Sequence, residues 1–331
     1  MFTFLTRRII SAISVVIATL IASFALFFIA PSDPASAICG DTRCSQQRYE
    51  DIKKSLNLDR PVTEQFADYA GGIVFGRDFT DGGTTTHCAA PCLGYSFKTG
   101  QPVLQQIGSR LPVTLTVVLG ASVIFFGVGV TMGSMAARRR GTAGDRALVG
   151  ATLVMSSIPY YLVALLVFLY LVISFPILPR PGYFPIAQYG PVKWFLGFLA
   201  PWLVLGIYNS TSYTRYSRGS MVESLSEDYV RTARSKGISE RRVTYLHGLR
   251  AAITPVVTIY GLDIAYLIVS SIFTERIFDL PGIGNLVLQS FNNSDLPMIM
   301  GTVIVGAVVL VVMNLLVDIV YSFLDPRVRL S

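Results

Sequence analysis

Six long apolar runs constrain this chain more than any other feature of its sequence. They lie at residues 9–30, 112–137, 147–175, 193–208, 251–273 and 298–323. An α-helix needs about 20 mainly apolar residues to cross the hydrocarbon layer of a bilayer. Charged residues make up only 14% of the chain, against roughly 25% in soluble domains. The sequence therefore predicts an all-α membrane protein of six transmembrane helices, with both ends on the same side.

The arginines and lysines indicate which side that is, because short cytoplasmic loops carry an excess of positive charge. Basic clusters stand at residues 7–8, 138–146, 228–255 and 327–329, all on one side of the predicted spans. The opposite short loops hold only Arg180, Lys193 and Arg276. We therefore expect both termini in the cytoplasm. This topology accounts for the formal net charge of +7, so we expect no nucleic-acid partner.

The first apolar run resembles an export signal, since Arg7 and Arg8 precede it and small residues follow it at 35–37. Its 22 residues exceed the roughly 7 to 15 of a signal-peptide core. We therefore expect an uncleaved first transmembrane helix at residues 1–30.

All four cysteines fall in the following segment, residues 31–108, which the topology places outside the cytoplasm. Cys39 and Cys44 stand in "CGDTRC", and Cys88 and Cys92 in "HCAAPC". An even number of cysteines on the oxidising side predicts two disulfides. A metal site that includes the neighbouring histidine is disfavoured, because such sites usually show tighter repeated CxxC spacing. Closure within each pair and pairing between the clusters both remain open.

Shorter patterns predict local features between the spans. Residues 56–72 have a turn followed by apolar residues at helical spacing, which predicts a short amphipathic helix at the outer surface. Four prolines in 176–185 exclude regular structure inside lipid. Gly129 and Gly133 form a GxxxG pair that lets two helices approach closely, either within the chain or between subunits.

The basic stretch "DYVRTARSKGISERRVTYLHGLRAAITP", residues 228–255, lies between two predicted spans. Ser226 is the expected N-cap of a short helix, and Gly237 its left-handed C-cap. A second helix is expected to begin at Ser239 and to continue into the fifth span. An interfacial helix that only binds anionic lipid is the alternative. It is disfavoured because the apolar face of the short helix is narrow and includes the small Ala233, and because anionic headgroups would repel the acidic first turn. We expect a surface helix, hinged by glycine, whose face fits a groove on another protein.

Seven motifs follow one another along nearly the whole chain. They are "LNLDRP", "LPVTL", "DYVRTARSKG", "HGLRAAITPVVT", "TERIFDLPGIGNLV", "SDLP" and "NLLVDIVYSFLDPRVR". In this order they resemble the B-type permease subunits of the bacterial oligopeptide, dipeptide and nickel ABC importers. The resemblance implies the type I ABC importer permease fold over residues 109–324, with a coupling loop at about 211–252 and a cytoplasmic tail at 325–331.

The resemblance also implies that the coupling loop docks on an ATP-hydrolysing partner. The residues that match this motif are Asp228, Tyr229, Ala233, Arg234, Lys236 and Gly237. The chain departs from the family pattern at Ser235 and at residues 250–252, where "RAA" replaces "RNA". The implied partners are ATP-binding subunits that hold ATP and magnesium, a second homologous permease, an extracytoplasmic substrate-binding protein and membrane lipid.

The chain itself lacks the motifs of an enzyme. It has no GxxxxGK[ST] phosphate loop, no HExxH and no GxSxG. We therefore expect no catalytic residue, no metal and no cofactor on this chain, with ATP hydrolysis on the partners. A stand-alone carrier or a membrane enzyme is disfavoured, because the spans hold one central acid without a paired partner. Peptide is the expected substrate, with nickel or glutathione as alternatives.

Several residues are candidates for the translocation pathway. Asp263 is an acid near the middle of an apolar span, where a charge costs about 2.5 to 3.5 kcal/mol on insertion scales. It either lines the pathway, with Tyr260 and Tyr266 nearby, or forms a hydrogen bond to a neighbouring span. Glu275 and the "PGIG" turn either form an external gate or binding-protein contact or are a plain loop turn. The glycines and proline of that turn are Pro281, Gly282 and Gly284.

Overall fold

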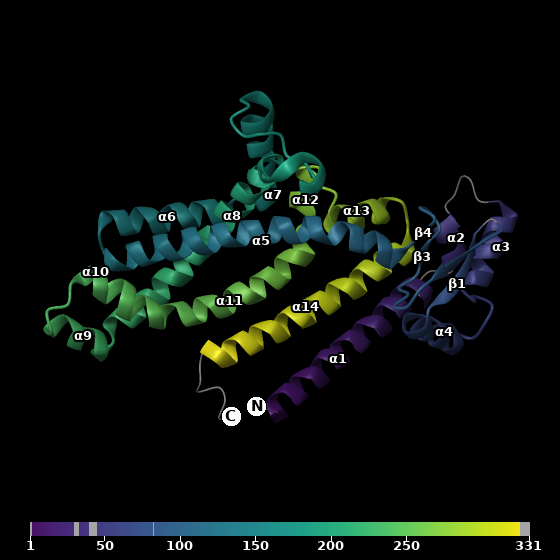
Figure 1. The fold of residues 1–331 in the computed structure, drawn as a ribbon, viewed down its shortest axis with the longest axis horizontal. Coiled ribbons are helices and arrows are strands. Elements are labelled where there is room, and N and C mark those ends of the chain that lie inside the picture. The colour runs from purple at the N-terminus through teal and green to yellow at the C-terminus, as the bar shows by residue number, and fades with distance from the viewer. Residues whose placement is uncertain (1, 30–32, 40–44, 82, 325–331) are drawn as a thin grey trace. The chain divides into compact units, whose positions relative to one another are not determined.

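A computed structural model describes residues 2–29, 33–39, 45–81 and 83–324 of the chain. The chain divides into two compact units. Unit 1 comprises Met1–Pro112 and Pro281–Val312, and unit 2 comprises Val113–Leu280 and Met313–Ser331. Helices make up most of the described chain (Figure 1), which confirms the all-α fold class.

The first helix of unit 1 is α1 (Phe2–Phe24), which continues as a π-helical turn, η1 (Ala25–Ile29). Its membrane-spanning part, Thr6–Ile29, is 24 residues long, and only 11% of its most apolar window is buried. A helix of this length crosses a bilayer, and its exposed apolar side chains suit a lipid environment. The first predicted span is thus a continuous helix.

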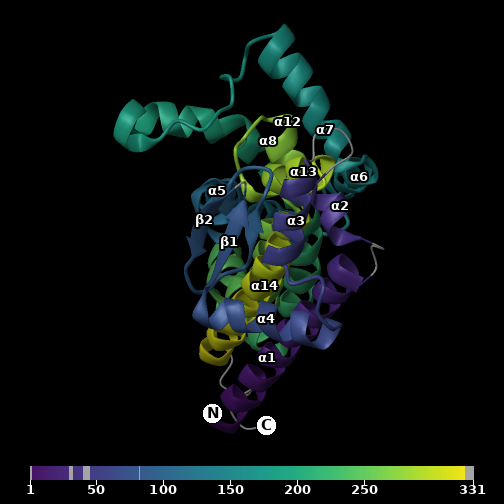
Figure 2. The ribbon, with the colours of Figure 1, turned by 90° about the vertical axis from the view of Figure 1, so that its right-hand side faces the viewer.

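The described part of residues 31–108, the segment predicted to lie outside the cytoplasm and called the outer segment below, folds into short helices and two small antiparallel sheets (Figure 2). Strand β1 pairs with β2 from Arg77 opposite Cys88 to Asp81 opposite Thr84, and β3 pairs with β4. These strands were not expected, because their polar sequences, "RDFTD" and "TTTHC", lack the alternation of apolar residues that marks a strand. The elements are α2 (Pro34–Cys39), α3 (Gln46–Ser55), α4 (Val62–Phe75), β1 (Arg77–Asp81), β2 (Thr84–Cys88), β3 (Tyr95–Ser96) and β4 (Gln101–Pro102).

Helix α4 confirms the amphipathic helix expected after the turn at Arg60 and Pro61. Its buried residues Gln65, Tyr69 and Gly72 recur at spacings of three and four, which place them on one face of a helix. Tyr69 packs in one core cluster of unit 1, and the aromatic residues Phe79, Tyr95 and Phe97 form the centre of a separate one.

Unit 1 also contains α13 (Ile283–Asn292) and the first part of α14 (Leu296–Leu324). Asp295 precedes α14, accepts a hydrogen bond from Ser96 of β3, and is buried. Burial raises the pKa of this carboxyl group above its usual range, while the Ser96 hydroxyl opposes that shift. The side chain thus connects the outer segment to the start of the last span.

Unit 2 is built from long helices, of which α8 and α11 pack together most extensively. The described chain as a whole has five helices long and apolar enough to cross a membrane, or up to six if a bent pair counts as one span. The remaining helices are α5 (Val103–Arg138), α6 (Ala143–Ser157), α7 (Tyr160–Val167), η2 (Phe168–Ser174), α8 (Ile186–Ser226), α9 (Asp228–Ser235), α10 (Glu240–Arg242), η3 (Val243–Gly248), α11 (Leu249–Ser270) and α12 (Ile272–Ile277).

The third predicted span, residues 147–175, is not straight. Helices Ala143–Ser157 and Tyr160–Ser174 are bent by 93° at Ile158 and Pro159. Proline has no backbone N–H and disfavours helical geometry in the residue before it. Ile158 accordingly has extended angles, φ −86° and ψ 129°. Apolar content predicted this span, but the proline decides its course.

The fourth span belongs to a much longer helix than residues 193–208. Helix α8 has 41 residues and an internal kink at Gly190, where φ is +76°. The preceding proline-rich loop, residues 176–185, is irregular as expected. The first part of the predicted coupling loop, residues 211–226, is therefore helical and belongs to α8. Helix α8 leads directly to the basic stretch.

The GxxxG pair packs against α8 of the same chain. A Cβ atom on Gly129 would lie 2.3 Å from Cβ of Tyr213, and one on Gly133 would lie 2.6 Å from the carbonyl oxygen of Thr214. Both distances are too short for any side chain. The structure thus decides between the two interpretations of this pair in favour of packing within the chain.

Candidate functional site

The basic stretch forms an elbow, which we define as residues 225–250, running from the end of α8 through α9 to the start of α11 (Figure 1). Helix α8 ends at Ser226, and Glu227 is the N-cap of α9 with extended angles and no side-chain cap bond. The expectation that Ser226 caps α9 is therefore wrong. Its hydroxyl instead donates to the carbonyl oxygen of Glu223, 2.6 Å away, as part of α8.

Gly237 ends α9 in a left-handed conformation, with φ at +74°. Its N–H donates to the carbonyl oxygen of Arg234 at 2.9 Å, and Ile238 N–H donates to that of Ala233 at 3.3 Å. A Cβ atom at Gly237 would meet no atom within 4 Å. Glycine is therefore favoured here by the backbone angle and not by crowding.

The inner face of the elbow is closed by the chain itself. Val230, Ala233 and Val243 are buried in one cluster, with Leu225 and Ile238 packed against it. The sequence suggested that this narrow face would fit a groove on another protein, and the structure corrects that. A small residue suits position 233 because the segment that follows Gly237 folds back over it.

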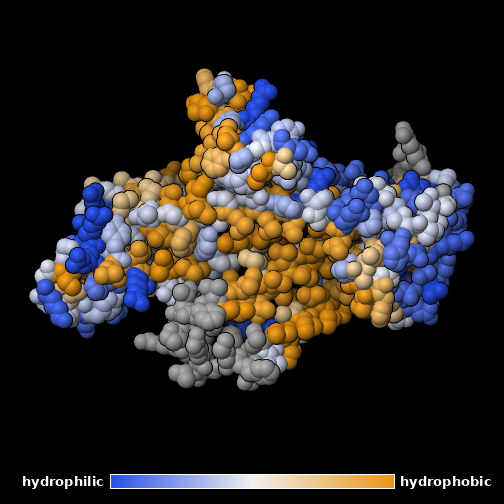
Figure 3. All heavy atoms as spheres, viewed as in Figure 1, coloured by the Kyte–Doolittle hydropathy of each residue, from blue (hydrophilic) through white to orange (hydrophobic). Residues whose placement is uncertain are grey.

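The outer face of the elbow is exposed and charged. The side chains of Asp228 and Arg231 form an ion pair with a 3.6 Å separation and are 97% and 75% exposed. Ser235 and Lys236 are also exposed. Figure 3 shows hydrophilic side chains gathered over α9 and α10 at the left, while apolar side chains predominate over the long helices. This face is the one available to a partner.

Polar bonds fix the elbow to the helices on either side of it. Arg234 pairs with Glu240 at 2.7 Å, across Gly237. Ser224 of α8 shares a 2.9 Å hydrogen bond with the Tyr229 hydroxyl and donates to the carbonyl oxygen of Gly248. The elbow therefore holds α9, α8 and the start of α11 in one block.

A second ion pair joins α6 to α8 close to the elbow. Asp145 is 3% exposed and accepts from Nε and Nη2 of Arg218 at 2.6 and 2.7 Å. It also accepts from the N–H of Gly141 at 2.9 Å. Neither residue of this pair was predicted from the sequence, although the one acid in "RRRGTAGDRA" is a signal that could have found it.

The central acid of the fifth span is bonded to a neighbouring span. The Tyr213 hydroxyl of α8 donates to Oδ2 of Asp263 at 2.7 Å. Tyr260 donates to Ser122 at 3.0 Å, whereas Tyr266 is 66% exposed. The hydrogen-bond interpretation of Asp263 is thus observed, and lining of the pathway remains a prediction.

Glu275 of α12 is fully buried. Thr114 of α5 donates to its Oε1 at 2.6 Å, and Ser271 donates to the same atom at 3.0 Å. Beside it, Thr274 shares a 2.6 Å hydrogen bond with Tyr160 of α7. In this conformation Glu275 connects helices of unit 2.

The "PGIG" turn is present in unit 1, where Gly282 is the N-cap of α13 with extended angles. Gly282 and Gly284 are buried, and Pro281 is half-buried. The expected turn is therefore confirmed, and its part in gating stays a prediction.

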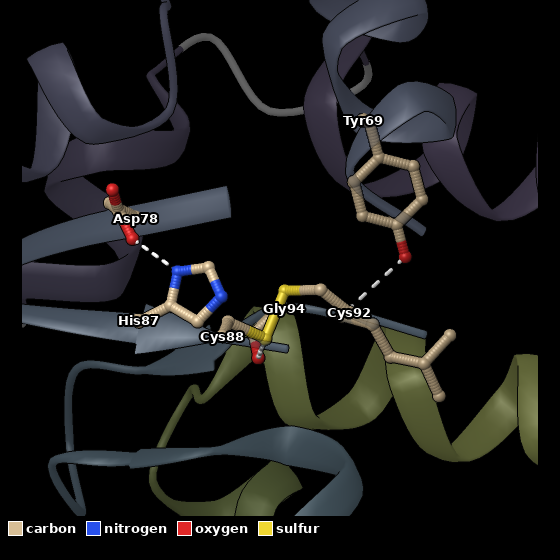
Figure 4. The surroundings of a disulfide bond; sticks show 7 residues. Tyr69, Asp78, His87, Cys88, Cys92 and Gly94 are labelled. Atoms are coloured by element: carbon tan, nitrogen blue, oxygen red, sulfur yellow. Dashed lines mark hydrogen bonds and ion pairs between the residues drawn. A yellow bond between two sulfur atoms is a disulfide. The ribbon is translucent and has the colours of Figure 1, made fainter. Parts of the chain in front are cut away.

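In the outer segment, Cys88 and Cys92 form a disulfide (Figure 4). The neighbouring His87 interacts with a different residue: its Nδ1 lies 2.6 Å from Oδ1 of Asp78. Local closure is thus confirmed for this pair. Cys39 is also disulfide-bonded, and Cys44 lies outside the described residues. Within the described ranges, no group of three or more His, Cys, Asp or Glu is arranged to hold a metal ion.

Comparison with known proteins gives two family matches that together cover nearly the whole chain. Residues 129–330 match the binding-protein-dependent transport system inner membrane component. Residues 1–118 match the N-terminal model of the same kind of membrane component. The chain belongs to this family.

Curated relatives of this permease agree along its full length. A probable peptide ABC transporter permease of Sinorhizobium fredii is 35% identical over 98% of this chain and 99% of its own. A putative peptide transport system permease of Brucella abortus is 35% identical over 98% of each chain. The dipeptide transport system permease DppB of Escherichia coli is 30% identical over 99% of both.

The protein is therefore a non-catalytic permease subunit of an ABC importer, resident in the inner membrane. The family resemblance drawn from the sequence motifs is confirmed. Membership of this family implies ATP-binding and substrate-binding partners. A stand-alone carrier and a membrane enzyme, the alternatives from another class, do not agree with it.

Proposed function

We propose that this permease imports peptides delivered by an extracytoplasmic substrate-binding protein. The names of three relatives support a peptide substrate. The permease pairs with a second homologous permease, and both of its termini lie in the cytoplasm. Nickel and glutathione are alternative cargoes for the same machinery, and no feature of the described spans favours either.

The elbow is the observation that supports coupling to ATP hydrolysis. Its exposed outer face, with Asp228 and Lys236, is available to an ATP-binding subunit that carries ATP and magnesium. Its inner face packs on Leu225 at the end of α8 and on Val243 at the start of the fifth span. A displacement of α9 is therefore transmitted to two spans at once, and this chain needs no cofactor of its own.

In this proposal the pathway residues respond to that displacement. The Tyr213–Asp263 bond joins α8 to α11, so movement between these helices strains or breaks it. The released carboxylate of Asp263 would then meet the amino group of a peptide, with Tyr260 and Tyr266 beside it. Glu275 and the turn from Pro281 to Gly284 would act as the external gate.

Substitution of Gly237 tests the coupling role. Gly237→Val places a β-branched residue at a φ of +74°, which costs at least about 1–2 kcal/mol for a residue with a Cβ atom. We expect the variant to insert normally and to lose most ATP-driven uptake of a radiolabelled dipeptide. Gly237→Asn should retain uptake, because asparagine tolerates the left-handed conformation.

Cross-linking provides an independent readout of the partner. A cysteine at exposed Ser235 should capture an ATP-binding subunit in membranes of cells that express the whole importer. A cysteine at exposed Thr84 of β2 is the control and should not. Normal dipeptide uptake by Gly237→Val, or no capture from position 235, would reject the coupling role of the elbow.

A further inference from the structure

A concave surface lies on the elbow next to α9. It has a volume of about 590 Å³ and is lined by Ser239, Arg241, Arg242, Tyr245 and Leu246. We call it the basic pocket. These residues lie within the predicted coupling loop, at about 211–252, but they are not among the residues that match its motif or among those of the predicted pathway.

The two arginines of the basic pocket have no acidic partner within it. Among the described residues, no carboxylate lies within ion-pair distance of Arg241 or Arg242. Glu240, their neighbour in the chain, is paired with Arg234 instead. Both arginines are exposed. The pocket therefore holds two positive charges that are free to bind an anion.

The position of the pocket along its helix places it at the edge of the bilayer. The span Glu240–Ser270 has 31 residues, which corresponds to roughly 46 Å at about 1.5 Å per residue. The hydrocarbon layer is only about 30 Å thick. The helix is thus about ten residues longer than the hydrocarbon layer is thick, and its charged end, which begins at Glu240, is the end that extends into and past the lipid headgroups.

The side chains change character in the order expected at such a depth. Arg241 and Arg242 come first, and Tyr245 and Leu246 follow one turn further along the span. The latter two are 41% and 58% exposed. Tyrosine is enriched at membrane interfaces, and an exposed leucine beside it suits an acyl chain. A cytosolic protein surface would leave this leucine in contact with water.

We propose that the basic pocket binds the phosphate of an anionic phospholipid, such as phosphatidylglycerol. The guanidinium groups of Arg241 and Arg242 bind the phosphate oxygens, and the hydroxyl groups of Ser239 and Tyr245 lie within the same pocket. Leu246 packs against the first part of the acyl chain. A lipid held here would brace the start of the fifth span beside the elbow. The proposal does not depend on peptide as the substrate.

Binding of phosphatidylglycerol to the purified importer tests this inference. The complete complex, with its ATP-binding subunits, is titrated in detergent with fluorescent phosphatidylglycerol, and with phosphatidylcholine as the uncharged comparison. Arg241→Gln/Arg242→Gln should weaken phosphatidylglycerol binding about thirtyfold, since each arginine contributes about 1 kcal/mol and 1.4 kcal/mol is a factor of ten. Leu246→Gln should weaken it less.

The matched control is Arg139→Gln/Arg146→Gln, which removes the same charge from exposed positions outside the pocket, and it should bind as the wild type does. Unchanged phosphatidylglycerol binding by the pocket double variant would overturn the proposal. So would competition by inorganic phosphate at millimolar concentration, which would indicate a site for the free anion. Loss of the ATP-binding subunits from the double variant with lipid binding intact would assign the surface to that partner instead.

Discussion

Gly133 is a residue whose missing side chain sets the distance between two helices. A Cβ atom there would lie 2.6 Å from the carbonyl oxygen of Thr214 and 2.7 Å from Cβ of Ser217. The backbone atom cannot rotate away, so α5 and α8 would have to separate. We predict that Gly133→Val destabilises the permease by roughly 1–3 kcal/mol, the usual cost of overpacking.

The control for this prediction lies on the same helix. Gly127 is exposed, and a Cβ atom there would meet nothing within 4 Å. Gly127→Val should therefore leave the thermal unfolding midpoint in detergent close to that of the wild type, while Gly133→Val lowers it. Equal midpoints for the two variants would show that the close approach of α5 and α8 does not contribute to stability.

At the scale of elements, Asp145 and Arg218 hold the start of α6 against α8. The pair is largely buried, with side-chain exposures of 3% and 27%. Breaking one side leaves the other charge without its partner in a region of limited solvent access. We predict that Asp145→Ala and Arg218→Ala each lower the unfolding midpoint, and that the double variant is less destabilised than their sum.

The ion pair of Asp228 with Arg231 serves as the control for Asp145 and Arg218. It joins the same two residue types but lies on an exposed surface. Alanine substitutions there should change stability little and additively, because exposed ion pairs contribute little. Additive effects of Asp145→Ala and Arg218→Ala would mean that the two side chains do not act as a pair.

The elements show what the sequence could and could not predict. The helices, the left-handed Gly237 and the turn before α13 follow from local patterns, since each depends on a few adjacent residues. The bend at Pro159 is also local, but the apolar content that predicted this span gave no weight to the proline. The burial of Ala233 requires the chain to fold back at Gly237 so that Val243 packs against it, which is contact between separate segments. The partners of Asp263 and Glu275 were open for the same reason: an acid in an apolar span must be satisfied, but the sequence does not say by which helix.

At the scale of the whole molecule, the prediction to be tested is the orientation of the chain in the membrane. We predict that a cysteine at Thr84 reacts with a membrane-impermeant maleimide in spheroplasts, which are cells with an intact inner membrane and no outer barrier. A cysteine at Ser235 should react only after that membrane is permeabilised. The described native cysteines are all disulfide-bonded and should not contribute to the signal.

The two positions probe the charge distribution that sets this orientation. Residue 84 lies in the outer segment, between the first two spans, and residue 235 lies in the elbow among the basic clusters. An excess of arginine and lysine keeps short loops in the cytoplasm, so we expect the elbow to lie there. A cytoplasmic ATP-binding subunit can reach the elbow only in this orientation. Reaction of the cysteine at position 235 in intact spheroplasts would invert the topology and would remove the elbow from any cytoplasmic motor.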